Sequence, residues 1–130
     1  MPRFELNKLV RDKLRDEYGC MEQIAVYKEL SPEEHKTYLI KKIIEEALEI
    51  ETDKPVDEII NEIADLQQVI DDLAVICNIT KDQISFAQKH RYDLKGGFSG
   101  GVFVETLELK DDDLWVEYYR KRPDVFIEEK

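Results

Sequence analysis

The sequence of 130 residues has little cysteine, no long apolar run and no excess of positive charge. Its two cysteines, Cys20 and Cys77, are too few for a disulfide framework and lack the spacing of paired zinc ligands. No run approaches the roughly 18 consecutive apolar residues that would span a membrane. Charges begin at Arg3, and no apolar stretch of a secretory signal follows it. These absences predict a cytoplasmic protein with reduced thiols that does not bind membranes.

Negative charge is concentrated in the middle of the chain. The 19 basic and 30 acidic residues give a formal net charge of −11, which argues against duplex nucleic acid as a partner. Residues 31–76 hold 4 basic and 13 acidic side chains, net −9, whereas residues 77–98 hold 4 basic and 2 acidic ones, net +2. Such a block indicates either solvated helix faces or acids gathered at one site.

Helix signals dominate the first three quarters of the chain. Ser31, Pro32 and Glu34 form a capping-box start for a helix reaching about residue 51. The break at residues 52–55 precedes a second helix, whose apolar side runs from Ile59 to Cys77. A helix over about 81–92 is expected after it. The first 30 residues predict a helix over about 6–18 and a short strand at 24–27.

The end of the chain has a different composition. Four glycines at 96, 97, 100 and 101 predict a loop. Residues 102–107 have strand composition and are expected to pair with residues 115–119. The predicted fold is therefore all-α, a helical bundle of about four helices with a small C-terminal β-hairpin appendage. We expect a single domain over 1–130, with a helical core of about 6–95 and the appendage at about 99–130.

Each of the two central helices carries an acidic pair three residues apart, which places both carboxylates of a pair on the same side of the helix. If the helices pack antiparallel, the two pairs face each other, because both are equally far from the turn at Pro55. The four carboxylates are Glu46, Glu49, Glu62 and Asp65.

Four adjacent carboxylates repel one another unless a cation neutralises them. Ligands that are all oxygen favour Mg²⁺, with Mn²⁺ as a substitute, and Mg²⁺ commonly shares its coordination with phosphate groups. The alternative, that these acids lie on solvated faces, stays open from spacing alone.

Three segments resemble the all-α nucleoside triphosphate pyrophosphohydrolase superfamily, in its MazG and phosphoribosyl-ATP pyrophosphohydrolase-like group. They are the acidic pattern at 45–65, the Asn-Lys-Leu-Val-Arg-Asp-Lys stretch at 7–13 and the Lys-Gly-Gly-Phe stretch at 95–98. The three occur in the family's order, although Lys95 stands where Arg is expected and the tail from about residue 105 has no counterpart.

The resemblance implies a homodimer or homotetramer that uses Mg²⁺ to split a nucleoside triphosphate into the monophosphate and pyrophosphate. It makes the four carboxylates the metal ligands, Glu45 a base or a group behind them, and Asp72 a contact to substrate or a second ion. Cys20 and Cys77 lack an activating His nearby in sequence, so a covalent intermediate is not expected. Two alternatives are phosphoribosyl-ATP hydrolysis and a non-catalytic helical module that binds nucleotide or protein.

Basic side chains on both flanks of the acidic block are candidates to bind substrate phosphate, or else they are ordinary surface charge. The candidates are Lys8, Arg11, Lys13, Arg91 and Lys95. The aromatic residues Trp115, Tyr118 and Tyr119 are expected to pack the appendage rather than to stack on a nucleobase.

Overall fold

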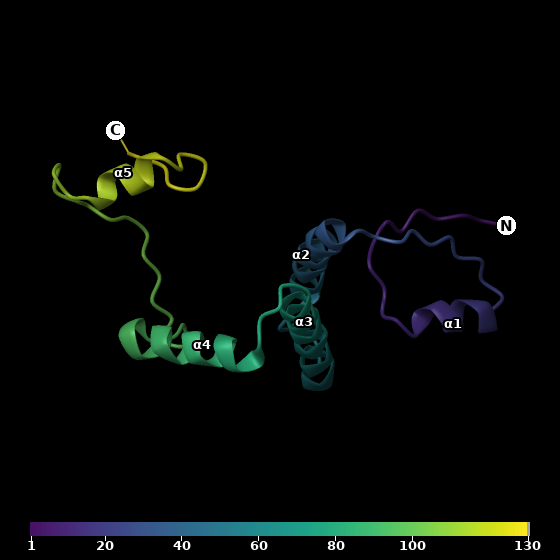
Figure 1. Ribbon diagram of the computed structural model, residues 1–130. Coiled ribbons are helices and arrows are strands. Elements are labelled where there is room, and N and C mark those ends of the chain that lie inside the picture. The colour runs from purple at the N-terminus through teal and green to yellow at the C-terminus, as the bar shows by residue number, and fades with distance from the viewer. Residues whose placement is uncertain (130) are drawn as a thin grey trace. The chain divides into compact units, whose positions relative to one another are not determined.

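The computed structural model describes residues 1–129, which form five helices. Contacts divide the chain into two units, Met1–Leu94 and Lys95–Lys130. The helices, labelled in Figure 1, are α1 (Leu14–Cys20), α2 (Pro32–Glu49), α3 (Val56–Ile76), α4 (Lys81–Lys95) and α5 (Trp115–Arg120). The all-α prediction is therefore confirmed for the described residues. None of these helices is both long and apolar enough to cross a membrane.

α2 begins where the sequence predicts, because Ser31 and Glu34 form a complete capping box. The Ser31 hydroxyl accepts from the Glu34 backbone N–H, and the Glu34 carboxylate accepts from the Ser31 backbone N–H. α3 follows after a short connection and ends at Ile76; Asn78, two residues further on, has a φ of 58° in the left-handed region. Two helices joined this closely and packed on each other run antiparallel.

The packing of α2 on α3 is the main tertiary contact of the first unit. Its buried apolar side chains are few, namely Leu39, Val69 and Ala74. Many large apolar side chains of the same helices stay exposed, including Ile44 (56%) and Leu48 (77%). We expected a bundle of about four helices. In the first unit, α2 and α3 are the two helices that pack on each other. Cys77, expected on the buried side, is exposed.

The N-terminal segment differs from the sequence prediction. Residues 1–13 have no regular structure, so the helix expected over 6–18 is reduced to α1, and the strand expected at 24–27 is absent from this segment. Asn7 has a φ of 47°, which a right-handed helix cannot accommodate. Lys8 and Arg11 form ion pairs with α2 and α3 instead of lying on a helix. Contacts remote in sequence therefore override the local helix pattern.

α4 agrees with its sequence signals. The Thr80 hydroxyl accepts from the Gln83 backbone N–H, and the Gln83 side chain accepts from the Thr80 backbone N–H. The helix ends at Lys95, and the next residue, Gly96, has a φ of 76° that suits glycine and few other residues. The loop predicted from the glycine cluster is confirmed, since residues 96–101 form no helix or strand.

The β-hairpin predicted for the C-terminal appendage is wrong. Residues 1–129 contain no strand; residues 102–107 are irregular, and 115–120 form the helix α5. The Asp113 carboxylate accepts from the backbone N–H of Trp115, the first residue of α5, at 2.8 Å. Helical spacing also brings Trp115 and Tyr118 together, with ring centroids 5.1 Å apart, and Tyr119 lies 4.9 Å from Phe126. Aromatic packing within the second unit therefore favours the helix over the strand.

Candidate metal and phosphate site

The acidic residues of α2 and α3 differ in their burial. Glu46 is buried, with 8% of its surface exposed, and the Glu62 side chain is only 14% exposed. Glu49 is exposed, and Asp65 is half-buried. One oxygen each of Glu46 and Glu62, Oε2 in both cases, is buried and accepts no hydrogen bond. Because a buried carboxylate oxygen without a partner is costly, these two atoms are the ones most in need of a cation.

A lysine in the turn between the helices connects two of the predicted ligands. The Lys54 ammonium group donates to a Glu62 carboxylate oxygen at 2.5 Å and to the Glu49 backbone carbonyl at 3.3 Å. Glu49 on α2 and Glu62 on α3 thus lie close enough together to contact the same ammonium group, as their equal distance from the turn predicts. The hydrogen bond to Glu62 raises the pKa of Lys54 above its ordinary value of 10.5.

Two lysines share the carboxylate of Glu45. Lys42 donates to Glu45 at 3.1 Å and lies 3.5 Å from a Glu46 oxygen, while Lys8 reaches the same Glu45 oxygen at 3.2 Å. Burial acts to raise the pKa of Glu45, but the hydrogen bonds from Lys42 and Lys8 outweigh it and lower the pKa below 4.5. Glu45 is therefore firmly ionised at neutral pH.

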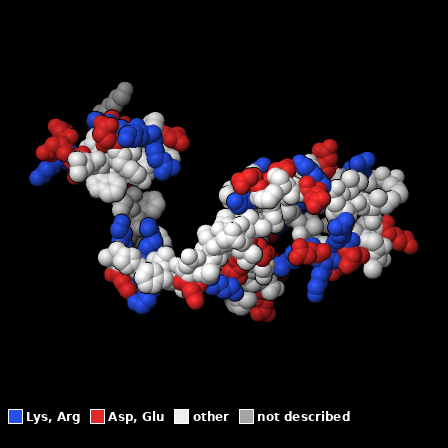
Figure 2. Space-filling view, in the orientation of Figure 1, with Lys and Arg blue, Asp and Glu red and all other residues white. Residues whose placement is uncertain are grey.

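The N-terminal segment also reaches α3. The Arg11 guanidinium group donates to an Asp65 oxygen at 2.6 Å, although the two residues lie 54 positions apart. Figure 2 shows Lys and Arg side chains beside Asp and Glu side chains over the unit formed by residues 1–94. The acidic block is thus accompanied by cations from the N-terminal segment, from α2 and from the turn.

The fit of this arrangement to a metal ion depends on donor chemistry and on spacing. All four predicted ligands are carboxylates, the donors that Mg²⁺ and Mn²⁺ prefer, and two of them have an unpartnered buried oxygen. Among residues 1–129, however, no three Asp, Glu, His or Cys side chains are close enough together to hold a metal ion in this conformation. The donor set suits a hard divalent cation, while ammonium and guanidinium groups contact the carboxylates in the conformation described.

The remaining predicted site residues form none of these hydrogen bonds. Asp72, further along α3, accepts from Gln68 on its own helix at 3.2 Å. Lys13 stands immediately before α1, and Arg91 and Lys95 lie on α4; none of the three forms an ion pair with another described residue. Lys95 belongs to the second unit.

Sequence reasoning missed two cations, Lys42 and Lys54. A usable signal existed for both. Lys42 precedes Glu45 and Glu46 by three and four residues, the spacing at which helical side chains pair. Lys54 is the only basic residue in the turn between the two acidic pairs. Charge pairing at helical spacing and across the turn therefore identifies both lysines from the sequence.

Comparison with known proteins adds no further support for a family, because no family model, curated protein or solved structure matches the chain. The resemblance therefore depends on the three sequence segments alone.

Proposed function

We propose that this protein hydrolyses a nucleoside triphosphate to the monophosphate and pyrophosphate in a reaction that requires Mg²⁺. The observation that carries the proposal is the pair of buried, unpartnered carboxylate oxygens on Glu46 and Glu62, in facing helices. Glu46, Glu49, Glu62 and Asp65 would hold the ion. The bound ion would neutralise phosphate charge and lower the pKa of an attacking water.

We propose that basic residues near these acids bind the phosphate groups of the substrate. Lys8 and Arg11 come from the N-terminal segment and lie within hydrogen-bond distance of Glu45 and Asp65. When a triphosphate binds, its oxygens offer these cations a second set of acceptors, and Arg11 can grip phosphate with two parallel hydrogen bonds. We assign both residues to substrate binding, with Lys13, Arg91 and Lys95 as further candidates.

The low pKa of Glu45 bears on its role. A general base works best when its pKa lies near the operating pH, and Glu45 is held well below that by Lys42 and Lys8. We therefore assign Glu45 to holding the two lysines in position and not to abstracting a proton. Asp72 contacts only Gln68 among its hydrogen-bonding neighbours, so a role toward substrate suits it better than membership of the ligand set.

One observation favours a second candidate function. The ion pairs of Lys54 with Glu62 and of Arg11 with Asp65 occupy carboxylates that catalysis needs for metal. A helical module that binds nucleotide without hydrolysing it would keep such pairs permanently. Hydrolysis of phosphoribosyl-ATP, the alternative within the enzyme class, uses the same anhydride chemistry and differs only in the substrate.

Pyrophosphate release tests the proposal. The purified protein is incubated with Mg²⁺ and a panel of ribo- and deoxyribonucleoside triphosphates, triphosphates with damaged bases, and phosphoribosyl-ATP. We expect pyrophosphate from at least one member, none after chelation of the metal, and a large loss in Glu62→Gln. Glu58→Gln, an exposed acid of the same helix, is the matched control and should retain activity. Substrate binding without any pyrophosphate would instead support the non-catalytic module.

A further inference from the structure

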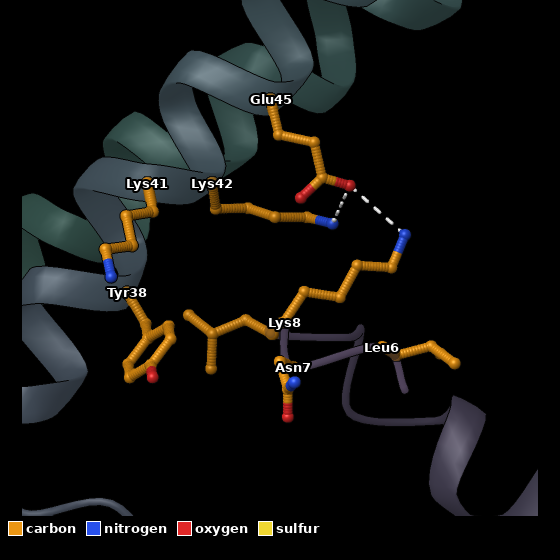
Figure 3. Close-up of a pocket in the computed structure, with 8 residues that line it drawn as sticks. Leu6, Asn7, Lys8, Tyr38, Lys41, Lys42 and Glu45 are labelled. Carbon is orange, nitrogen blue, oxygen red and sulfur yellow. Dashed lines mark hydrogen bonds and ion pairs between the residues drawn. The ribbon is translucent and has the colours of Figure 1, made fainter. Parts of the chain in front are cut away.

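A pocket of about 330 Å³ lies between the N-terminal segment and α2 (Figure 3). Its polar lining consists of Asn7, Lys8, Tyr38, Lys41, Lys42 and Glu45. The volume equals that of roughly ten water molecules, which is ample for two phosphate groups. Sequence analysis singles out only Lys8 and Glu45 from this set. The pocket is therefore a feature of the folded chain that the acidic pattern alone does not reveal.

The pocket is positively charged within the most acidic part of the chain. Three lysines against one glutamate leave a net charge of +2 in the lining, whereas residues 31–76, with 4 basic and 13 acidic side chains, have a net charge of −9. Lys41 has no carboxylate within ion-pair distance among residues 1–129. Its ammonium group instead lies 4.9 Å from the centre of the Tyr38 ring. The pocket thus has a surplus of cations without matching protein anions.

Glu45 keeps two of these cations close together. Lys8 and Lys42 donate to the same carboxylate oxygen, and Figure 3 shows their side chains converging on it from opposite elements. Two ammonium groups bound to the same carboxylate oxygen repel each other, and one carboxylate offsets only part of their charge. An anion with several oxygens, placed in the pocket, would accept hydrogen bonds from both lysines and from Lys41.

The backbone at Asn7 contributes to this geometry. Its φ of 47° is in the left-handed region, which non-glycine residues adopt at a cost. The residue turns the chain so that Leu6 and Lys8 both line the pocket against α2. Lys42 is held firmly as well, with a side chain that is only 17% exposed. Lys42 is therefore held in place before any ligand arrives, and Lys8 is paired with the same carboxylate oxygen of Glu45.

We infer that this pocket binds the phosphate chain of the substrate, with Lys8, Lys41 and Lys42 as donors and Glu45 as a positioning residue. That these phosphates belong to a nucleotide rests on the proposed function. The charge and size of the pocket are observed independently of that function. Lysines are point charges with rotatable donors, so they suit phosphate groups whose oxygens present no single fixed geometry.

Direct binding without metal tests the inference. Isothermal titration in the presence of a chelator measures the affinity for pyrophosphate, for a non-hydrolysable nucleoside triphosphate analogue and for the uncharged nucleoside. Lys41→Met keeps the length of the side chain and breaks no ion pair, so it should leave the melting temperature nearly unchanged. We expect it to weaken the binding of both phosphate ligands by about tenfold or more. Lys36→Met, on the same helix and outside the pocket, should change the affinity by less than about twofold.

The outcomes separate the pocket from the enzymatic activity. Wild-type affinity for pyrophosphate in Lys41→Met, or equally tight binding of the bare nucleoside, would overturn the assignment even if the wild type hydrolyses triphosphates. A wild type that releases no pyrophosphate from any substrate, yet binds it in a manner that depends on Lys41, would support the pocket while refuting the proposed reaction. If pyrophosphate depends on Lys41 and the analogue does not, the pocket is a product site and the substrate assignment is overturned.

Discussion

The ammonium group of Lys54 lies 2.5 Å from Oε1 of Glu62, whose other carboxylate oxygen is buried without a partner. Lys54 comes from the turn, so the helix pair carries a tethered cation next to one of its predicted metal ligands. A divalent ion that binds Glu62 must compete with this lysine. The competition gives the metal hypothesis a test that does not depend on catalysis.

Lys54→Met should lower the stability of the metal-free protein and enlarge the stabilisation that Mg²⁺ provides. Without metal, the variant should melt at a lower temperature than the wild type, because the largely buried Glu62 carboxylate loses its cation. With saturating Mg²⁺, the rise in melting temperature should exceed that of the wild type, because no lysine competes for the ligand. Lys89→Met removes an exposed ion pair on α4 and serves as the control. Equal metal-induced rises in the three proteins would contradict a metal site at Glu62.

Asp65→Asn should lower turnover by about a hundredfold or more while leaving the fold intact. The substitution removes a charge from the proposed ligand set and one ion pair to Arg11, whose side chain is 62% exposed, so little packing is lost. Arg11→Ala should instead raise KM more than it lowers kcat, as expected for a group that binds the ground state. Steady-state kinetics and circular dichroism of both variants check this, and full turnover in Asp65→Asn would exclude Asp65 as a ligand.

Glu45 makes the stability of the protein depend on acid pH. Burial acts to raise its pKa, but hydrogen bonds from Lys42 and Lys8 prevail and hold the pKa of the folded form below 4.5. The unfolded form therefore binds more protons, and the contribution of Glu45 is present above pH 4.5 and lost as the pH falls through the folded pKa. The difference in urea midpoint between the wild type and Glu45→Gln should thus be constant near neutrality and shrink below pH 4.5.

A difference that stays unchanged down to acid denaturation would contradict this account of Glu45. Comparing the two proteins is necessary because acidification also changes the net charge, from −11 near neutrality through zero at about pH 4.7 to positive values, and the resulting change in charge repulsion affects both proteins alike.

We expect the protein to form a dimer or a larger oligomer. Among residues 1–129 only three apolar side chains are buried, whereas Ile40, Ile44 and Leu48 of α2 are each more than half exposed. So small a core rarely holds a domain of this size together unaided. Leu48→Glu should shift the sedimentation coefficient toward that of a monomer, whereas Leu114→Glu, at an exposed position of the second unit, should not. A stable wild-type monomer at micromolar concentration would contradict the expectation.

Local chemistry explains how much of the fold the sequence predicts. The starts of α2 and α4 follow from reciprocal capping bonds between residues three apart, and these bonds are present at Ser31 and Thr80. The acidic pairs on α2 and α3 follow from helical spacing in the same way. Each of these features involves partners within one turn of helix, so no knowledge of tertiary structure is needed.

The errors arise where distant partners decide the conformation. The helix expected from residue 6 fails because Lys8 and Arg11 pair with residues 37 and 54 positions away. The expected strand at 115–119 is a helix, and its Tyr119 packs on Phe126, which lies outside the helix and seven positions further along the chain. Lys54 was missed for the same reason, since its partner Glu62 lies on the next helix.

The most direct test of the central claim is phosphorus NMR of the reaction products with Mg²⁺ present. If the carboxylates of α2 and α3 serve attack by water at the anhydride between the α and β phosphates, a nucleoside monophosphate and intact pyrophosphate should appear together from the first time point. Both signals should be strongly reduced with Glu62→Gln and fully present with Glu58→Gln. A nucleoside diphosphate with orthophosphate as the first products would contradict the proposed reaction.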